Sequence, residues 1–116
     1  MKSPLSISQE DLISIKNRYA EMMVSEKEGD IEIFKASLFM LLAILDPYWE
    51  VLNFTFGDQN LSPLYGLVKF TVGEFGRIPG GKKDVSTKEQ MRETRKIISH
   101  LLKNNGIHVE KPNTRR

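Results

Sequence analysis

The stretch IEIFKASLFMLLAILDPYWEVLNFTF, residues 31–56, is the most apolar part of this 116-residue chain. Apolar side chains recur along it at helical spacing, at Phe34, Leu38, Leu41, Leu42 and Leu45. Phe39, Met40 and Ile44 widen this stripe until the helix is apolar on most sides. Such a helix must be covered by other elements or by a second copy of the chain. The stretch therefore predicts an all-α fold, with four to five helices bundled around a central hydrophobic helix and a homodimer as a way to complete the cover.

Capping residues predict where the first two helices begin and end. Ser8 or Ser6 is suited to cap a helix that starts near Gln9 and ends near Ser25. Asp30 is a suitable N-cap for the central helix. At its other end, Asp46-Pro47 is expected to end or kink that helix, because proline lacks the amide hydrogen and disfavours α geometry at the residue before it.

The second half of the chain predicts two further helices. Ser62-Pro63 fits an N-cap followed by proline at the first helical position. The segment Leu64–Phe75 fits a helix, although VKFTV within it also alternates as a strand does; helix is preferred because a lone strand would lack a partner. A capping box, Ser86 to Glu89, opens the last helix, and Asn104, Asn105 and Gly106 are expected to end it. Its expected buried residues are Met91, Ile98, Leu101 and Leu102, with Ile97 at the margin.

Turns and connectors separate these helices. Residues 57–60, GDQN, predict a turn, and residues 76–84, GRIPGGKKD, predict a connector that lacks both phosphate-binding glycine motifs. Trp49, the single tryptophan, is interpreted as a packing anchor.

Length and composition indicate one soluble domain covering residues 1–116, with residues 1–7 and 108–116 expected to be flexible. The chain contains no cysteine, which excludes disulfides and thiolate metal sites. The start of the chain carries no apolar leader, and the densest apolar run, Leu38–Leu45, is far shorter than the ~20 residues that span a bilayer. We therefore expect a cytoplasmic protein without membrane contact.

Charge is divided unevenly along the chain. Residues 1–58 contain 5 Lys and Arg against 10 Asp and Glu, a net −5, and residues 59–116 contain 12 against 5, a net +7, which together give the overall +2. A basic half suggests phosphate contacts with nucleic acid, whose affinity would fall with salt. Two oppositely charged ends of one molecule that attract each other are a second interpretation, and segregated, solvated helix faces are the preferred one. The candidate nucleic-acid-binding residues are Lys82, Lys83, Lys88, Arg92, Arg95, Lys96 and Lys103, with Arg115 and Arg116 in the tail.

One spacing within the last helix has a known parallel. Residues 91–100, MRETRKIISH, place an arginine and a histidine five positions apart, at Arg95 and His100. This resembles the Arg-x4–6-His motif of HEPN domains, a helical superfamily. The preceding stretch LSPLYGLVKFTVGEFGRI is similar to the corresponding part of the mannitol operon repressor group, so the resemblance covers residues 57–100. It departs from the pattern at Lys96, where the family often has Asn or Asp.

The resemblance implies a metal-independent endoribonuclease in which His100 acts as general acid or base and Arg95 stabilises the charged phosphorane. Five residues along a helix turn by about 500°, so the two side chains are expected to point ~140° apart. Arg95 should then lie at the edge of the buried face and His100 towards solvent, and one phosphate could meet both only through distortion or a second copy. A solvated basic helix face is the preferred interpretation of the motif.

The sequence therefore favours a non-enzymatic binding or regulatory protein that contacts nucleic acid through its basic half. The alternatives are the HEPN-like ribonuclease and a protein-interaction module of the inhibitor or immunity type. The pattern predicts neither a cofactor nor a metal site: there are two histidines, no cysteine and no HExxH motif.

Overall fold

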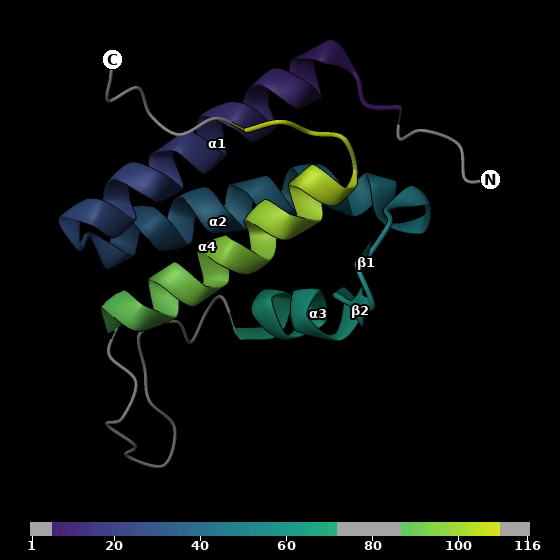
Figure 1. Cartoon of the computed structure of the whole chain (residues 1–116). Helices are drawn as coiled ribbons and strands as arrows, with labels where there is room; N and C mark the ends of the chain where they lie inside the picture. The colour runs from purple at the N-terminus through teal and green to yellow at the C-terminus, as the bar shows by residue number, and fades with distance from the viewer. Residues whose placement is uncertain (1–5, 72–86, 110–116) are drawn as a thin grey trace, which may run out of the picture.

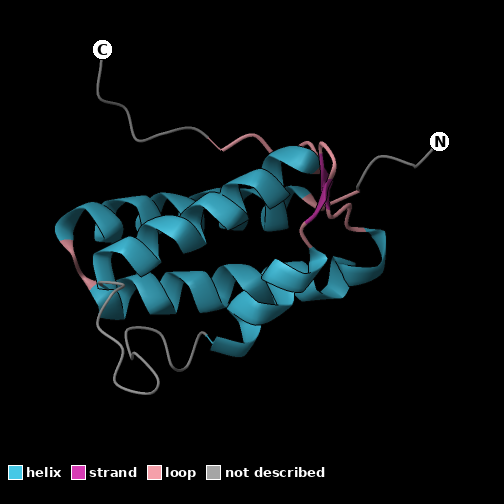
Figure 2. Cartoon of the chain, turned by 60° about the horizontal axis from the view of Figure 1, so that its bottom comes forward, coloured by secondary structure: helices cyan, strands magenta, loops and turns pink. Residues whose placement is uncertain are grey.

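The computed structural model describes residues 6–71 and 87–109, and most of these residues are helical, as predicted. Helices α1 and α2 lie side by side, α4 crosses in front of them, and α3 packs below α4 (Figure 1). A short hairpin, β1–β2, stands at the end of this assembly (Figure 2). The bounds are α1 Gln9–Glu28, α2 Ile31–Leu45, the 3₁₀ helix η1 Asp46–Val51, β1 Thr55–Phe56, β2 Gln59–Asn60, α3 Ser62–Thr71 and α4 Thr87–Asn104.

Local capping chemistry places the α1–α2 hairpin. The Ser8 hydroxyl accepts a hydrogen bond from the Asp11 amide at 3.1 Å, and the Asp30 carboxylate accepts one from the Ile33 amide at 3.2 Å. Both N-caps agree with the sequence prediction. Helix α1 runs to Glu28, beyond the predicted end near Ser25, because Gly29 adopts φ 76° and closes the last turn through its own amide.

The proline-containing junctions differ in detail from the predictions. Helix α2 ends at Leu45 as expected, and Asp46-Pro47 opens η1. Helix α3 begins at Ser62, one residue earlier than predicted, so Pro63 is its second residue; the Asn60 side chain accepts from the Ser62 amide at 2.9 Å. The segment left open between helix and strand is helical through Thr71, and its remainder lies outside the described residues.

The hydrophobic core gathers one face from each helix. The predicted stripe of α2 is buried, and so is the predicted face of α4, with Ile97 half-buried at its margin. Helix α1 contributes Ile15, Tyr19 and Met22. The flanks also reach the core, since Ile7 and Val109 pack partly against it. The fully or nearly buried set on α2 and α4 is Phe34, Leu38, Leu41, Leu42, Leu45, Met91, Ile98, Leu101 and Leu102.

In the described part of the chain, the outer side of α2 stays exposed. Phe39 is 60% exposed and Met40 is 47% exposed, although the sequence predicted that these residues would be covered by neighbours or by a second copy. Ile44 is half-buried. Within residues 6–71 and 87–109, one side of α2 is therefore covered and the opposite side is exposed.

Aromatic residues of η1, of α3 and of the segment between them form a cluster, and that segment also contains the hairpin, which the sequence did not predict. Trp49 packs against Phe54 and Tyr65, with ring centroids 4.9 and 5.5 Å away, yet it stays 40% exposed. Burial, helped by the charge of Asp46, raises the pKa of Tyr65. Of the predicted turn at residues 57–60, only residues 57–58 form the tip of this antiparallel hairpin, where Gly57 adopts φ 61°, and Gln59–Asn60 form β2.

Candidate nucleic-acid interface

Helix α4 presents a basic stripe on the side away from the core. Its residues follow each other at spacings of 4, 4, 4 and 3, which keeps them on one broad surface of a helix. From first to last they span about 22 Å along the helix axis. Only His100 among them is half-buried, and the rest are exposed. We call this set the α4 stripe: Lys88, Arg92, Lys96, His100 and Lys103.

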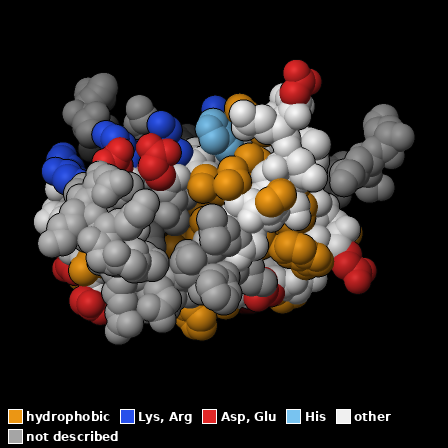
Figure 3. All heavy atoms as spheres, turned by 90° about the horizontal axis from the view of Figure 1, so that it is seen from below, with side chains coloured by type: hydrophobic (Ala, Val, Ile, Leu, Met, Phe, Trp, Pro, Cys, Tyr) orange, Lys and Arg blue, Asp and Glu red, His pale blue; other side chains and the backbone are white. Residues whose placement is uncertain are grey.

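Acidic side chains accompany the α4 stripe. Glu93 lies one turn before Lys96, and their charged atoms are 4.0 Å apart in an exposed pair. Glu89 is also exposed on this side of the helix. Figure 3 shows lysine and arginine side chains gathered along one edge, with acidic side chains beside them and a histidine next to hydrophobic ones. The stripe is thus basic on balance but not uniformly so.

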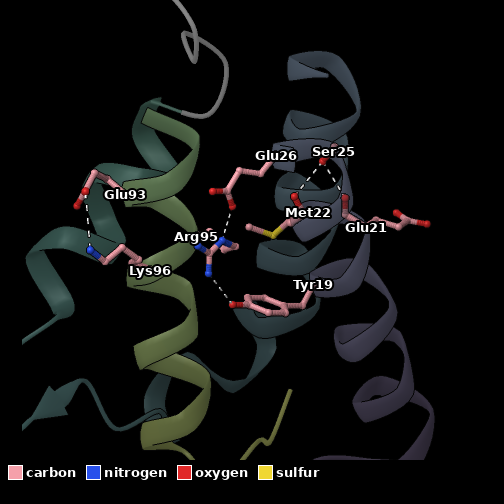
Figure 4. A network of polar contacts seen from close by, with 8 residues as sticks. All are labelled: Tyr19, Glu21, Met22, Ser25, Glu26, Glu93, Arg95 and Lys96. Atoms are coloured by element: carbon pink, nitrogen blue, oxygen red, sulfur yellow. Dashed lines mark hydrogen bonds and ion pairs between the residues drawn. The ribbon is translucent and has the colours of Figure 1, made fainter. Parts of the chain in front are cut away.

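Arg95, which the sequence assigned to the nucleic-acid surface, contacts helix α1 instead. Its Nε donates to Glu26 Oε1 in a close ion pair, and its Nη1 donates to the Tyr19 hydroxyl at 3.5 Å (Figure 4). Burial by itself lowers the pKa of Arg95, but these hydrogen bonds and the charge of Glu26 raise it above its ordinary value. The guanidinium lies at the edge of the buried face, as its helical angle predicted, and it joins α4 to α1.

His100 lies beside the hairpin rather than in open solvent. Its ring packs against Phe56 of β1, with centroids 4.3 Å apart and an interplanar angle of 36°. Its Nδ1 is buried and has no hydrogen-bond partner among the described residues. The predicted solvent-facing position of His100 is therefore wrong, because the β1–β2 hairpin covers one side of the ring. Phe56 remains 36% exposed next to it.

The end of α4 is fixed by two asparagines that the sequence treated only as helix stops. Asn105 accepts from the Asn53 amide at 2.7 Å and donates to the Asn53 carbonyl at 2.9 Å. Asn104 donates to the same carbonyl at 3.0 Å. Gly106, at φ 77°, then turns the chain so that Ile107 enters the core. These contacts tie α4 to the segment that leads into the hairpin and so place Phe56 beside His100.

The candidate residues are therefore only partly brought together. The α4 stripe forms one surface, whereas Arg95 and His100 contact different elements and do not share a site within one chain. Lys82, Lys83, Arg115 and Arg116 lie outside the described residues, as do Ser86 of the capping box and the connector at 76–84. The sequence analysis did not include Phe56 in this surface. The signal that could have identified it is its position, an aromatic residue directly before the predicted turn at 57–60.

Metal-binding clusters and membrane-spanning helices are both missing from the described parts of the chain. Within residues 6–71 and 87–109, no group of three or more His, Asp or Glu side chains is arranged to hold a metal ion. None of the helices in the same two segments is long and apolar enough to cross a membrane.

Similarity to known proteins does not indicate a family or a function for this chain. The chain matches no protein-family model, no curated protein and no solved structure at a significant level.

Proposed function

We propose that this chain is a cytoplasmic, non-enzymatic binding protein, a small helical bundle built around α2, that contacts nucleic acid through the α4 stripe. The observation that supports the proposal is the stripe itself: four exposed cationic side chains and a histidine on one continuous helical surface. Lysine and arginine contact phosphates without reading sequence. The surface thus suits the nucleic-acid backbone, and base-specific recognition is not part of the proposal.

The stripe gives a quantitative expectation for salt dependence. If its four exposed cations each neutralise one phosphate, log affinity should fall with log salt at a slope of about −3.6 for duplex DNA and about −2.8 for a single strand. Affinity would then fall roughly 150-fold or 50-fold, respectively, between ~50 and ~200 mM salt. Phe56 beside His100 adds an exposed ring on which an unpaired base can stack, which favours the single strand.

Fluorescence anisotropy with labelled single-stranded and duplex oligonucleotides tests this proposal. Changing Arg92 or Lys96 to Gln should weaken binding and make the salt slope shallower by roughly one phosphate each. Lys16→Gln is the matched control, because Lys16 is exposed on α1, away from the stripe. Affinity that stays flat with salt, or an equal loss in the Lys16 variant, would contradict the proposal. Capture of a defined acidic protein with no retention of nucleic acid would favour the protein-interaction module instead.

A ribonuclease of the HEPN type is the alternative proposal. The feature that favours it is the place of His100 within the stripe that would hold RNA, since an imidazole can transfer protons near neutral pH. Arg95 would have to leave Glu26 to reach a phosphate bound there. RNA cleavage in EDTA that disappears in His100→Ala, with binding retained, would support the enzyme; cleavage unchanged in that variant would exclude the site.

A further inference from the structure

Helix α2 carries an apolar face that the described residues of the chain leave exposed. Phe39, Met40 and Ile33 are 60%, 47% and 50% exposed, and Ala36 and Ala43 between them are exposed too. The positions 33, 36, 40 and 43 follow helical spacing, so they form one surface on the side of α2 opposite its buried stripe. We call Ile33, Ala36, Phe39, Met40 and Ala43 the α2 outer face.

The neighbouring helix extends this surface. Val24 of α1 is 43% exposed. A hollow of about 390 Å³ between α1 and α2 is lined by Val24, Ala20 and Ile33, with Glu21, Ser25 and Glu28 as its polar members. An exposed apolar surface that spans two helices is a common sign of a contact with another protein. A stable interface needs roughly 800 Å² from each partner, so the outer face of α2 has to be joined by this part of α1.

The order of residues on the α2 outer face identifies the partner. Ala36, Phe39, Met40 and Ala43 are separated by 3, 1 and 3 positions, so small and large side chains read the same in both directions. A twofold interface brings residue i of one copy to residue j of the other, and j to i. In an antiparallel crossing centred between Phe39 and Met40, each large side chain meets a large one, and Ala36 faces the partner copy's Ala43.

Charges at the two ends of the face favour the same arrangement. Lys35 and Asp46 are eleven residues apart, close to three full turns, and therefore lie on one flank of α2. Antiparallel pairing sets Lys35 of each copy, which lies 4.0 Å from Glu32 of its own helix, near Asp46 of the other copy. The midpoint between Lys35 and Asp46 in the sequence lies one residue from the midpoint between Phe39 and Met40, so the same antiparallel register suits both the charges and the apolar residues.

We propose that the chain forms a twofold-symmetric homodimer in which the α2 outer face packs antiparallel against the same face of a second copy. Helix α4 packs on the other side of α2, so the dimer would leave both α4 stripes exposed. The inference does not depend on nucleic-acid binding, since it uses none of the stripe residues.

Sedimentation equilibrium of the full chain over roughly 1 to 100 µM tests the dimer. Wild type should be dimeric, and Phe39→Glu should raise the dissociation constant at least about a hundredfold, because each dimer contains the substitution twice. Val51→Glu is the matched control, because Val51 is 52% exposed on η1, outside the face. Since Phe39 is exposed within one copy, circular dichroism of the variant should keep its helical content. A monomeric wild type, or a Phe39→Glu variant that dimerises like wild type, would overturn the proposal.

Cysteine pairing tests the antiparallel register separately. The chain has no cysteine of its own, so only introduced thiols can react. A mixture of Ala36→Cys and Ala43→Cys chains should oxidise to a dimer that links position 36 to position 43. Each variant alone should stay unlinked, because residues seven positions apart are offset by ~10 Å along the axis and a disulfide needs Cα atoms within about 7 Å. Rapid linking of Ala36→Cys to itself would overturn the antiparallel arrangement.

Discussion

Replacing Asn105 with alanine should destabilise the chain more than replacing its neighbour Asn104. The side-chain amide of Asn105 makes three hydrogen bonds. Its Oδ1 accepts from the backbone N–H of Asn53, and its Nδ2 donates to the backbone carbonyls of Asn53 and Leu101. No apolar side chain can replace these contacts. Because they connect α4 to the segment before the hairpin, the substitution should also loosen the position of Phe56.

The size of the effect follows from what each group loses. A net hydrogen bond contributes ~0.5–1.5 kcal/mol, and a buried group left without a partner costs ~1–3 kcal/mol. The Asn53 carbonyl keeps a partner, since Asn104 still donates to it at 3.0 Å, but the Asn53 amide loses its acceptor. Asn53 is half-buried, so water partly compensates. We therefore expect a loss of about 2–3 kcal/mol in the free energy of unfolding, or roughly 10 °C in Tm.

Urea unfolding followed by far-UV circular dichroism measures this loss. The midpoint should fall while the m-value stays constant, because the area exposed on unfolding does not change. Asn104→Ala is the internal control: it removes one bond to a carbonyl that Asn105 still contacts, so it should cost less than ~1 kcal/mol. If Asn105→Ala costs less than ~0.5 kcal/mol, or no more than Asn104→Ala, the bridging role assigned to Asn105 is wrong.

Three further changes test other parts of the fold. Arg95→Met leaves the Glu26 carboxylate, which is 15% exposed, without its ion-pair partner, and should cost ~1–3 kcal/mol in the free energy of unfolding measured with urea. Lys96→Met, at an exposed position, is the control and should cost less than ~0.5 kcal/mol. Equal losses in the two variants would refute the pairing. The raised pKa of Tyr65 means that the folded chain keeps a proton that the unfolded chain releases above pH ~10, so the free energy of unfolding should fall by up to ~1.4 kcal/mol per pH unit above that value. Tyr65→Phe should remove this part of the loss. Identical profiles of stability against pH for wild type and variant would contradict the prediction. Leu41→Ala should cost ~2–5 kcal/mol by calorimetry, since Leu41 is fully buried, and a loss below ~1 kcal/mol would contradict its place in the core.

Local rules account for what could be predicted from the chain alone. Helix starts at Ser8 and Asp30, the stop at Gly106 and the buried face of α4 all depend on contacts within a few residues, and the structure agrees with each. Capping, glycine conformation and helical periodicity are properties of neighbouring positions. Helical periodicity also predicted correctly that Arg95 lies at the edge of the buried face.

Contacts between distant segments decided the candidate site, and no local pattern contains them. Arg95 pairs with Glu26, 69 positions away, and this contact withdraws it from the basic surface. His100 is covered by Phe56 because two asparagines hold the hairpin segment against α4. The composition of α2 indicated by itself that the helix needs cover on most sides, whereas only tertiary packing determined which side stays exposed. Among the described residues, α1, η1 and α4 contact α2, and its predicted stripe lies in the core that they share, which leaves Phe39 and Met40 exposed.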